Sequence, residues 1–172
     1  MKPLPQLTYG MPIDMAADVP LFPPFATALT VFVAFVCSRI VRLKLATWIS
    51  LSFRVVALAI AIGMSIWVVR TAGDELDSAG SGTLFTPVGG LATGGLYQYT
   101  RNPMYSGLVF VCLPAAAVFF NSLWPLLLGP LLFYYLNNVV IAAEEKLLYA
   151  AFGAQYEALC KVVPRWLVHL RL

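Results

Sequence analysis

Four long apolar segments alternate with polar stretches along this chain. They cover about residues 21–37, 48–69, 104–120 and 123–143. Each approaches the roughly 20 apolar residues that an α-helix needs to cross a lipid bilayer. The pattern therefore predicts an all-α fold, an integral membrane helical bundle with about four transmembrane helices.

The link between the third and fourth apolar segments is very short. Only Asn121 and Ser122 separate them. Helices joined by so few residues run antiparallel. We therefore expect a helical hairpin that returns the chain to the membrane face it left.

Two polar regions flank this hairpin. Residues 70–102 contain three carboxylates and a stretch rich in Gly, Ser and Thr, which indicates a long polar connection. The tail from Glu144 has apolar residues at helical spacing and is interrupted near Gly153. We expect it to form a C-terminal interfacial helix that lies on the membrane surface or covers a site.

The composition supports a membrane protein and excludes several function classes. Hydrophobic residues make up 60% of the 172 residues and charged residues only 11%, whereas soluble domains carry about 25% charged residues. The mean hydropathy is +0.82. A net charge of +3, spread along the chain, gives no sign of a nucleic-acid partner.

Metal-binding patterns are absent from the sequence. The single histidine, His169, has no companion ligand, and Cys37, Cys112 and Cys160 fit no zinc or redox spacing. We predict no metal site and interpret the cysteines as small apolar filler.

Lysine and arginine residues orient the predicted bundle. With four spans, the N-terminus, the 70–102 connection and the tail share one side and carry seven of these residues, against three on the other side. All eight carboxylates lie on the first side as well. The positive-inside rule makes that side cytoplasmic, so we expect a multi-pass protein with its polar chemistry on the cytoplasmic face.

The segment GLYQYTRNPMYSG, residues 95–107, enters the third span. Pro103 suits the first turn of a helix, and the exposed amides of a helix start attract an anion. Arg101 adds a fixed positive charge beside Asn102 and Tyr105. A basic anchor at the membrane interface with belt tyrosines explains the same residues.

A carboxylate pair, Glu144 and Glu145, ends the fourth span. Charged groups in such a place are costly unless they are paired or functional. Steps of seven and eleven back from Glu145 reach Asn138 and Tyr134, and Asn137 lies seven before Glu144. These residues form a polar stripe, which hydrogen bonds between helices would also explain.

The hairpin is expected to return the carboxylate pair to the membrane face where Arg101 lies. A ligand with both a carboxylate and an ammonium group would match the two charges. S-adenosylmethionine has both, and its sulfonium is attracted to tyrosine faces. A simple salt bridge would account for the charges equally well.

The two motifs, in this order, resemble the isoprenylcysteine carboxyl methyltransferase and phospholipid methyltransferase superfamily of membrane enzymes. The resemblance covers about residues 83–167. Its pattern reads roughly G-P-Y-x-Y-x-R-H-P-x-Y-x-G and, after a hairpin, E-E-x-x-L-x-x-x-F-G-x-x-Y with a V-P-R-like ending. The residues in step are Gly95, Tyr97, Tyr99, Arg101, Pro103, Tyr105, Gly107, Glu144, Glu145, Leu148, Phe152, Gly153, Tyr156, Val163, Pro164 and Arg165.

The resemblance implies an S-adenosylmethionine-dependent methyltransferase built inside the bilayer. Residues 1–172 then form a single membrane domain, with two N-terminal spans and a loop in 1–82 and the cofactor-binding core in 83–172. It implies catalytic roles for Arg101 and Glu145. Cofactor-binding candidates are Tyr97, Arg101, Asn102, Tyr105, Glu144 and Glu145; pocket candidates are Tyr156 and Arg165, with Tyr134 and Asn138 from the polar stripe.

The acceptor is expected to be a lipophilic small molecule that enters from the bilayer. Asn102 stands where the superfamily has histidine, and asparagine does not titrate near neutral pH. A carboxylate acceptor needs no base, so a prenylcysteine carboxylate is favoured. An amine or thiol must lose a proton first, which Glu144 or Glu145 would have to accept.

Other interpretations stay open at this point. A phospholipid, thiol or amine methyltransferase of the same superfamily fits the motifs too. Membrane sterol reductases share a related C-terminal pattern and bind NADPH, but they are usually much longer. A non-catalytic membrane protein that retains the fold is the third, supported by Asn102. The oligomeric state is not indicated.

Overall fold

The computed structural model describes residues 19–80 and 90–167, and all the regular structure in these residues is helical. Two long helices come first, α1 (Pro23–Ile40) and α2 (Leu51–Ser78). The later elements are η1 (Gly95–Gln98), α3 (Pro103–Gly107), η2 (Leu108–Cys112), α4 (Leu113–Phe120), α5 (Trp124–Tyr135), η3 (Leu136–Val140), α6 (Ile141–Phe152) and α7 (Ala154–Val162).

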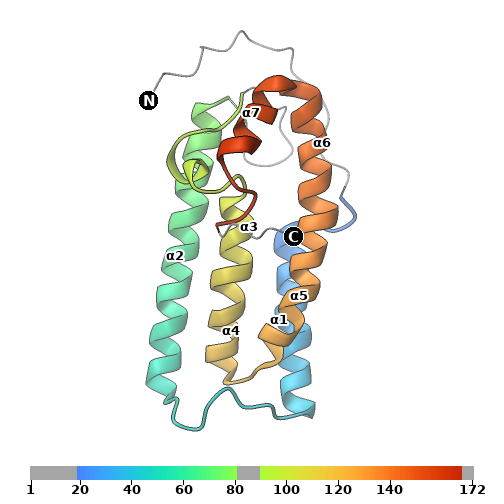
Figure 1. Cartoon of the computed structure of the whole chain (residues 1–172). Helices are drawn as coiled ribbons and strands as arrows, with labels where there is room; N and C mark the ends of the chain where they lie inside the picture. Colours follow the sequence, from blue (N-terminus) through green and yellow to red (C-terminus); the bar gives the residue numbers. More distant parts are fainter. Residues whose placement is uncertain (1–18, 81–89, 168–172) are drawn as a thin grey trace.

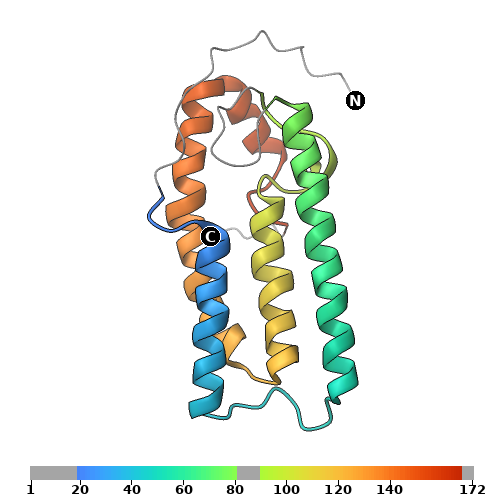
Figure 2. The same ribbon diagram turned by 180° about the vertical axis from the view of Figure 1, so that it is seen from behind.

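Within the described residues, four helices are long and apolar enough to cross a membrane. They are α1, α2, the continuous helix Pro103–Phe120 and the continuous helix Trp124–Phe152. Helix α4 packs against both α2 and α5, and α1 packs against α5 (Figures 1 and 2). This arrangement confirms the predicted all-α membrane bundle.

Helix α2 continues further than the apolar pattern indicated. The polar connection was expected from residue 70, but the helix ends only at Ser78. Its 28 residues span about 42 Å at 1.5 Å per residue, more than the roughly 30 Å of a hydrocarbon core. An apolar pattern marks the part that crosses lipid, whereas the helix itself can extend beyond it. Residues 81–89 of the predicted connection lie outside the described residues.

The predicted hairpin between the third and fourth spans is present. Asn121 ends α4 with a φ of 48°, in the left-handed region that asparagine tolerates. The backbone N–H of Ser122 then donates to the carbonyl of Ala117 at 2.9 Å. This tight turn makes α4 and α5 antiparallel neighbours (Figure 1).

The α1–α2 loop (residues 41–50) crosses the tip of this hairpin, at the lower end of the bundle in Figure 1. Hydrogen bonds hold the loop to the tip. They are Leu123 N–H to Leu43 O (2.9 Å), Trp124 Nε1–H to Val41 O (2.8 Å) and Ala46 N–H to Asn121 Oδ1 (3.1 Å).

Both spans of the hairpin contain a π-helical segment. In the third span, η2 directly precedes Leu113 and Pro114. Proline has no N–H and its ring clashes with the preceding turn, and a π-bulge is one way for a helix to accommodate such a break. In the fourth span, η3 has no proline, and its effect on residue spacing matters for the site.

The C-terminal part folds back over the end of the bundle where α3 begins (Figure 1). Gly153 separates α6 from α7 with a φ of +47°, which favours glycine. After α7, residues 163–167, here called the C-terminal strap, run back toward the helices. Trp166 of the strap is only 4% exposed and packs against Phe133 of α5, with ring centroids 4.7 Å apart.

Candidate functional site

The segment just before α3 is fixed to the C-terminal strap by hydrogen bonds. The backbone N–H of Arg101 donates to the carbonyl of Pro164 at 2.9 Å. The Thr100 hydroxyl and the Asn102 side-chain amide both donate to the carbonyl of Arg165, each at 3.0 Å. All five residues lie in the two predicted motif segments, so the motifs meet through the backbone as well as through side chains.

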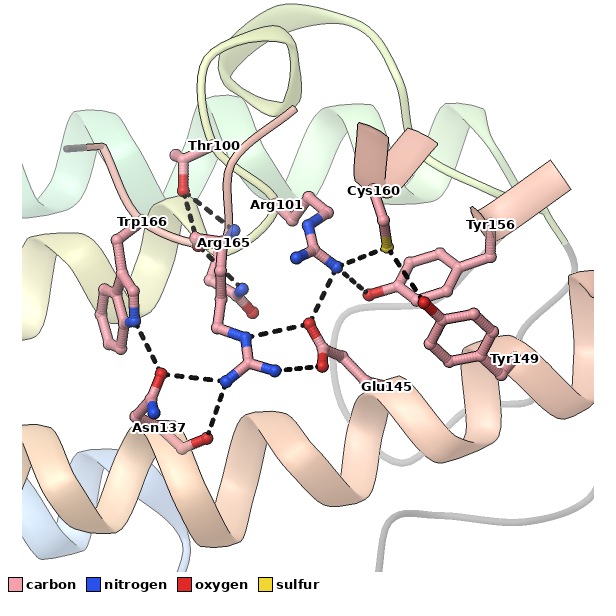
Figure 3. Close-up of polar contacts among 10 residues, drawn as sticks. Thr100, Arg101, Asn137, Glu145, Tyr149, Tyr156, Cys160, Arg165 and Trp166 are labelled. Atoms are coloured by element: carbon pink, nitrogen blue, oxygen red, sulfur yellow. Dashed lines mark hydrogen bonds and ion pairs between the residues drawn. The ribbon is translucent and has the colours of Figure 1, made fainter. Parts of the chain in front are cut away.

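Arg101 lies at the centre of a side-chain network (Figure 3). Its Nη1 donates to Glu145 Oε1 at 2.8 Å, to the Tyr156 hydroxyl at 2.8 Å and to Cys160 Sγ at 2.7 Å. The Arg101 and Glu145 side chains are 12% and 13% exposed. The hairpin and the returning α7 thus place a nearly buried ion pair at the end of the bundle.

Glu145 also accepts from a second guanidinium group. Arg165 of the strap donates to both carboxylate oxygens of Glu145, with Nε 3.1 Å from Oε1. The Nη1 of Arg165 donates to Asn137 Oδ1 at 3.0 Å, and Trp166 Nε1 donates to the same oxygen at 3.0 Å. Figure 3 shows both guanidinium groups directed at the single Glu145 carboxylate.

The environment keeps this network in defined protonation states. Burial lowers the pKa of the Arg101 guanidinium, but the attraction of Tyr156 and Glu145 outweighs it and raises the pKa overall. Burial, together with the negative charge of Glu145, raises the pKa of Tyr156 well above its ordinary value. Arg101 therefore stays charged and Tyr156 keeps its proton at any physiological pH.

Glu144 belongs to a separate polar cluster. Its carboxylate accepts a hydrogen bond from the Tyr105 hydroxyl. Burial, followed by the negative charges of Glu144 and Glu75, raises the pKa of Tyr97 well above its ordinary value. The two neighbouring glutamates thus face different partners, one the arginines and the other the tyrosines.

The charges in this part of the molecule do not balance within each cluster. Arg101 and Arg165 bring two positive charges to the one carboxylate of Glu145. Among the described residues, Glu144 has no cationic partner. None of the described residues accepts a hydrogen bond from the buried Nε of Arg101. A surplus cation therefore lies close to a surplus carboxylate.

The structure leaves Tyr134 outside this network and connects Asn138 to it only through Asn137. Tyr134 is 67% exposed. The Asn138 amide donates to the Tyr134 carbonyl at 3.1 Å, and its Oδ1 accepts from Asn137 Nδ2 at 3.4 Å. Neither Tyr134 nor Asn138 forms a hydrogen bond with Glu145. The expected stripe assumed regular α-helical spacing, but η3 lies between these residues and Glu145. A π-helical segment adds one residue to the turn, so the residue on the Glu145 face lies eight positions back, at Asn137. The spacing of seven was wrong for this reason.

Several residues of the network were not predicted from the sequence. Cys160 accepts a hydrogen bond from Arg101, so it is not merely apolar filler as expected. Glu75, near the end of α2, accepts from the backbone N–H of Gly94 at 2.7 Å and so holds the loop that leads into η1. Trp166 and Thr100 had no signal at all, because only the folded strap gives them partners.

The comparisons with known proteins agree with this picture. A family model described as phospholipid methyltransferase matches residues 53–155, which is more than half of the chain. The chain belongs to the phospholipid methyltransferase family. Searches of curated proteins and of solved structures gave no significant match. As a family member with four candidate spans, the protein is a membrane methyltransferase.

For a phospholipid methyltransferase family member, Asn102 is the main departure within the first motif. Its amide donates to the Arg165 carbonyl at 3.0 Å and its backbone N–H donates to the Thr100 hydroxyl at 3.2 Å. A neutral histidine also has one ring N–H to donate. Asn102 therefore supplies a hydrogen bond that holds the strap, without providing a group that titrates.

Proposed function

We propose that this protein transfers a methyl group from S-adenosylmethionine to a lipophilic small-molecule acceptor. The observation that carries the proposal is the unbalanced pair of charges at one end of the bundle, in a chain of a methyltransferase family. The amino-acid end of S-adenosylmethionine carries one carboxylate and one ammonium group. It would supply the two charges that the described side chains lack.

The residues at this end fit the cofactor in type and placement. Arg101 offers a buried Nε donor without an acceptor among the described residues, and with Arg165 it suits the carboxylate. Glu144 suits the ammonium, and the tyrosine faces of Tyr97 and Tyr105 suit a sulfonium. When bound, the cofactor supplies a methyl group on positively charged sulfur.

The chain's own contribution to such a transfer is binding, alignment and the exclusion of water. Arg101 and Glu145, the predicted catalytic residues, act here by fixing the reactants in place. The strap, anchored by Trp166, holds the charged network in place through Arg165. Tyr134 and Asn138 on the outer face of the fourth span stay predictions for contact with the acceptor in the bilayer.

A carboxylate acceptor, most like a prenylcysteine carboxylate, is the first choice. Such a group arrives ionised and needs no base, and Asn102 offers none. An amine, as in an ethanolamine phospholipid, must lose a proton first. Glu144 is a carboxylate at this end that no arginine holds and could accept that proton, which makes the phospholipid amine the second choice.

Cofactor binding is tested by calorimetry on the purified, folded protein. We expect Arg101→Ala and Glu144→Gln each to weaken S-adenosylmethionine binding by about 2–5 kcal/mol. Arg70→Gln is the matched control, since Arg70 is exposed near the end of α2 and has no place in the network. Folded wild-type protein that does not bind the cofactor would exclude the proposal.

The acceptor is tested with methyl-labelled cofactor and three candidate acceptors: a prenylcysteine, phosphatidylethanolamine and a small thiol. Mass spectrometry then identifies the methylated product. We expect a prenylcysteine methyl ester. A methylated amine would instead identify the ethanolamine phospholipid as the acceptor. Cofactor binding without any product from these or a membrane lipid extract would indicate a non-catalytic protein that keeps the fold.

The site end of the bundle is proposed to face the cytoplasm. The seven lysine and arginine residues on this side of the sequence, against three on the other, support this orientation. A reporter fused to the C-terminus tests it. Alkaline phosphatase is expected to be inactive there and green fluorescent protein to fluoresce; the reverse pattern would invert the orientation.

A further inference from the structure

Among the residues that the structure describes, those at the end of the bundle opposite the candidate site carry only positive charge. Its basic cluster consists of Arg39 at the end of α1, Arg42 and Lys44 in the α1–α2 loop, and Arg54 in the first turn of α2. The sequence has no Asp or Glu from 19 to 73 or from 108 to 143. No carboxylate of these segments can therefore neutralise the cluster.

The backbone that carries the cluster is held in a defined shape. The α1–α2 loop is tied to the hairpin tip through Leu43, Ala46 and the indole of Trp124. Figures 1 and 2 both show this loop running from α1 to α2 beneath the tip. The charges are thus presented on an ordered support at one level of the bundle, and a partner need not order a long loop to bind them.

Arg54 is the member of the cluster that most needs a partner. It lies within a candidate membrane span, and its Nε is buried without a hydrogen-bond acceptor among the described residues. Its guanidinium also forms no ion pair with any carboxylate of the described residues. A buried donor that is left without an acceptor costs free energy, so an anion from outside the chain is expected to accept from it.

The surroundings of the cluster select an anion that belongs to a lipid. Trp48 in the loop is 77% exposed, and Leu51 and Phe53 at the start of α2 are exposed as well. Aromatic residues at a span end lie at the level of the lipid headgroups. The cluster therefore meets lipid phosphates and apolar chains together, which a soluble anion would not offer.

We propose that the basic cluster binds the headgroups of anionic phospholipids in the leaflet at this end of the bundle. The binding is independent of the methyltransferase site, which lies at the other end (Figure 1). Arg54 binds the phosphate nearest the bundle, and Arg39, Arg42 and Lys44 hold the negative surface around it. Such contacts anchor the bundle at a fixed depth and favour an anionic lipid environment.

Native mass spectrometry of the full chain tests the proposal. The protein is released from vesicles of phosphatidylcholine and phosphatidylglycerol in equal amounts, and the retained lipids are counted. Wild-type protein is expected to retain clearly more phosphatidylglycerol than phosphatidylcholine. A basic residue near a charged surface contributes about fivefold to affinity. The preference for phosphatidylglycerol over phosphatidylcholine is therefore expected to fall by up to about a hundredfold in the triple variant Arg39→Gln, Arg42→Gln, Lys44→Gln.

Arg54→Gln and Arg70→Gln form a matched pair on α2, one near each end. The first is expected to lower the retained phosphatidylglycerol about fivefold and the second to leave it unchanged. Circular dichroism confirms that each variant is folded, and cofactor binding by Arg54→Gln is expected to equal that of the wild type. Equal retention by Arg54→Gln and the wild type, or an equal loss in Arg70→Gln, would overturn the proposal.

A competition arm separates a lipid from a free anion. Soluble glycerol phosphate is added to the vesicles at millimolar concentration before release. The retained phosphatidylglycerol is expected to stay the same, because a soluble anion lacks the apolar contacts. Displacement by glycerol phosphate would show a site for free phosphate and would contradict lipid binding.

Discussion

The two ends of the bundle hold their polar groups by different means. At the site end, charged side chains of both signs contact one another directly, as in the pair Arg101 and Glu145. At the opposite end, backbone groups and the side chains of Asn121 and Trp124 fix the α1–α2 loop. The basic residues there have no ion pair with any described carboxylate.

This difference indicates which end can take up a ligand that carries charges of both signs. A ligand with its own charges can replace or join an ion pair between side chains. Main-chain hydrogen bonds at a turn, by contrast, hold the fold and offer little to a ligand. Changes at the site end are therefore expected to alter both stability and cofactor binding. Changes to the hydrogen bonds that hold the α1–α2 loop are expected to alter stability and to leave cofactor binding unchanged.

The largest effect is expected from Glu145→Gln. The change leaves the nearly buried guanidinium of Arg101 and the partly exposed guanidinium of Arg165 without their carboxylate. Removing one partner of a buried ion pair typically costs about 3–5 kcal/mol, and unfolding in sodium dodecyl sulfate measures it. Glu157→Gln, in an exposed pair with Lys161, is the control. Equal stability of the two variants would contradict a central role for Glu145.

A smaller loss of stability is expected from Gly94→Ala. A Cβ at this position would overlap the Glu75 carboxylate, which accepts the Gly94 backbone N–H. The side chain of Glu75 would have to move and lose this bond, worth about 1.5–3 kcal/mol for a charged acceptor.

Gly63→Ala is the matched control for this change, because a Cβ at Gly63 meets nothing within 4 Å. Alanine in a helix is favoured over glycine by about 0.5–1 kcal/mol, so this variant should be slightly more stable. Cofactor affinity should fall only in Gly94→Ala, since the loop after it carries Tyr97 and Arg101. A loss of cofactor affinity in both variants would contradict the assignment of the effect to the contact between Gly94 and Glu75.

Two tryptophans allow the ends to be compared with one kind of change. Trp166→Phe removes the indole hydrogen bond to Asn137, and Trp124→Phe removes the one to the Val41 carbonyl. Each bond contributes about 0.5–1.5 kcal/mol. The buried Trp166 also fills space, so its change should cost more. Only Trp166→Phe should weaken cofactor binding, and an equal weakening in both would contradict the division between the ends.

The smallest effect is expected from pH at the exposed pair of Glu157 and Lys161. The hydrogen bond and charge of Lys161 lower the pKa of Glu157, and Glu157 raises the pKa of Lys161. The pair therefore contributes above the ordinary pKa of a glutamate and loses its contribution as pH falls through the lowered value. Unfolding of the wild type and Glu157→Gln should differ slightly at pH 7 and converge in acid.

Much of the fold was predictable because a bilayer imposes simple rules. The four apolar segments and the link at Asn121 and Ser122 predicted the spans and the hairpin. The proximity of Arg101 and Glu145 followed from the hairpin and from the order of the two motifs. The helix ends did not follow, because α2 continues past its apolar part to Ser78.

The details of the site depended on contacts that no local pattern encodes. The π-helical segment η3 moved the inward position from Asn138 to Asn137, and nothing in the sequence there marks it. The partners of Cys160 and Trp166 come from segments that lie far away in the chain.

The sequence by itself determined the class of protein, the number of spans and the two charged motifs, because hydrophobic length and charge cost act locally along the chain. Only the tertiary structure decided how the charges are shared, with Glu145 held by two arginines and Glu144 by a tyrosine. The physical reason is that ion-pair geometry depends on the relative positions of α3, α6 and the strap. Packing between distant segments sets those positions.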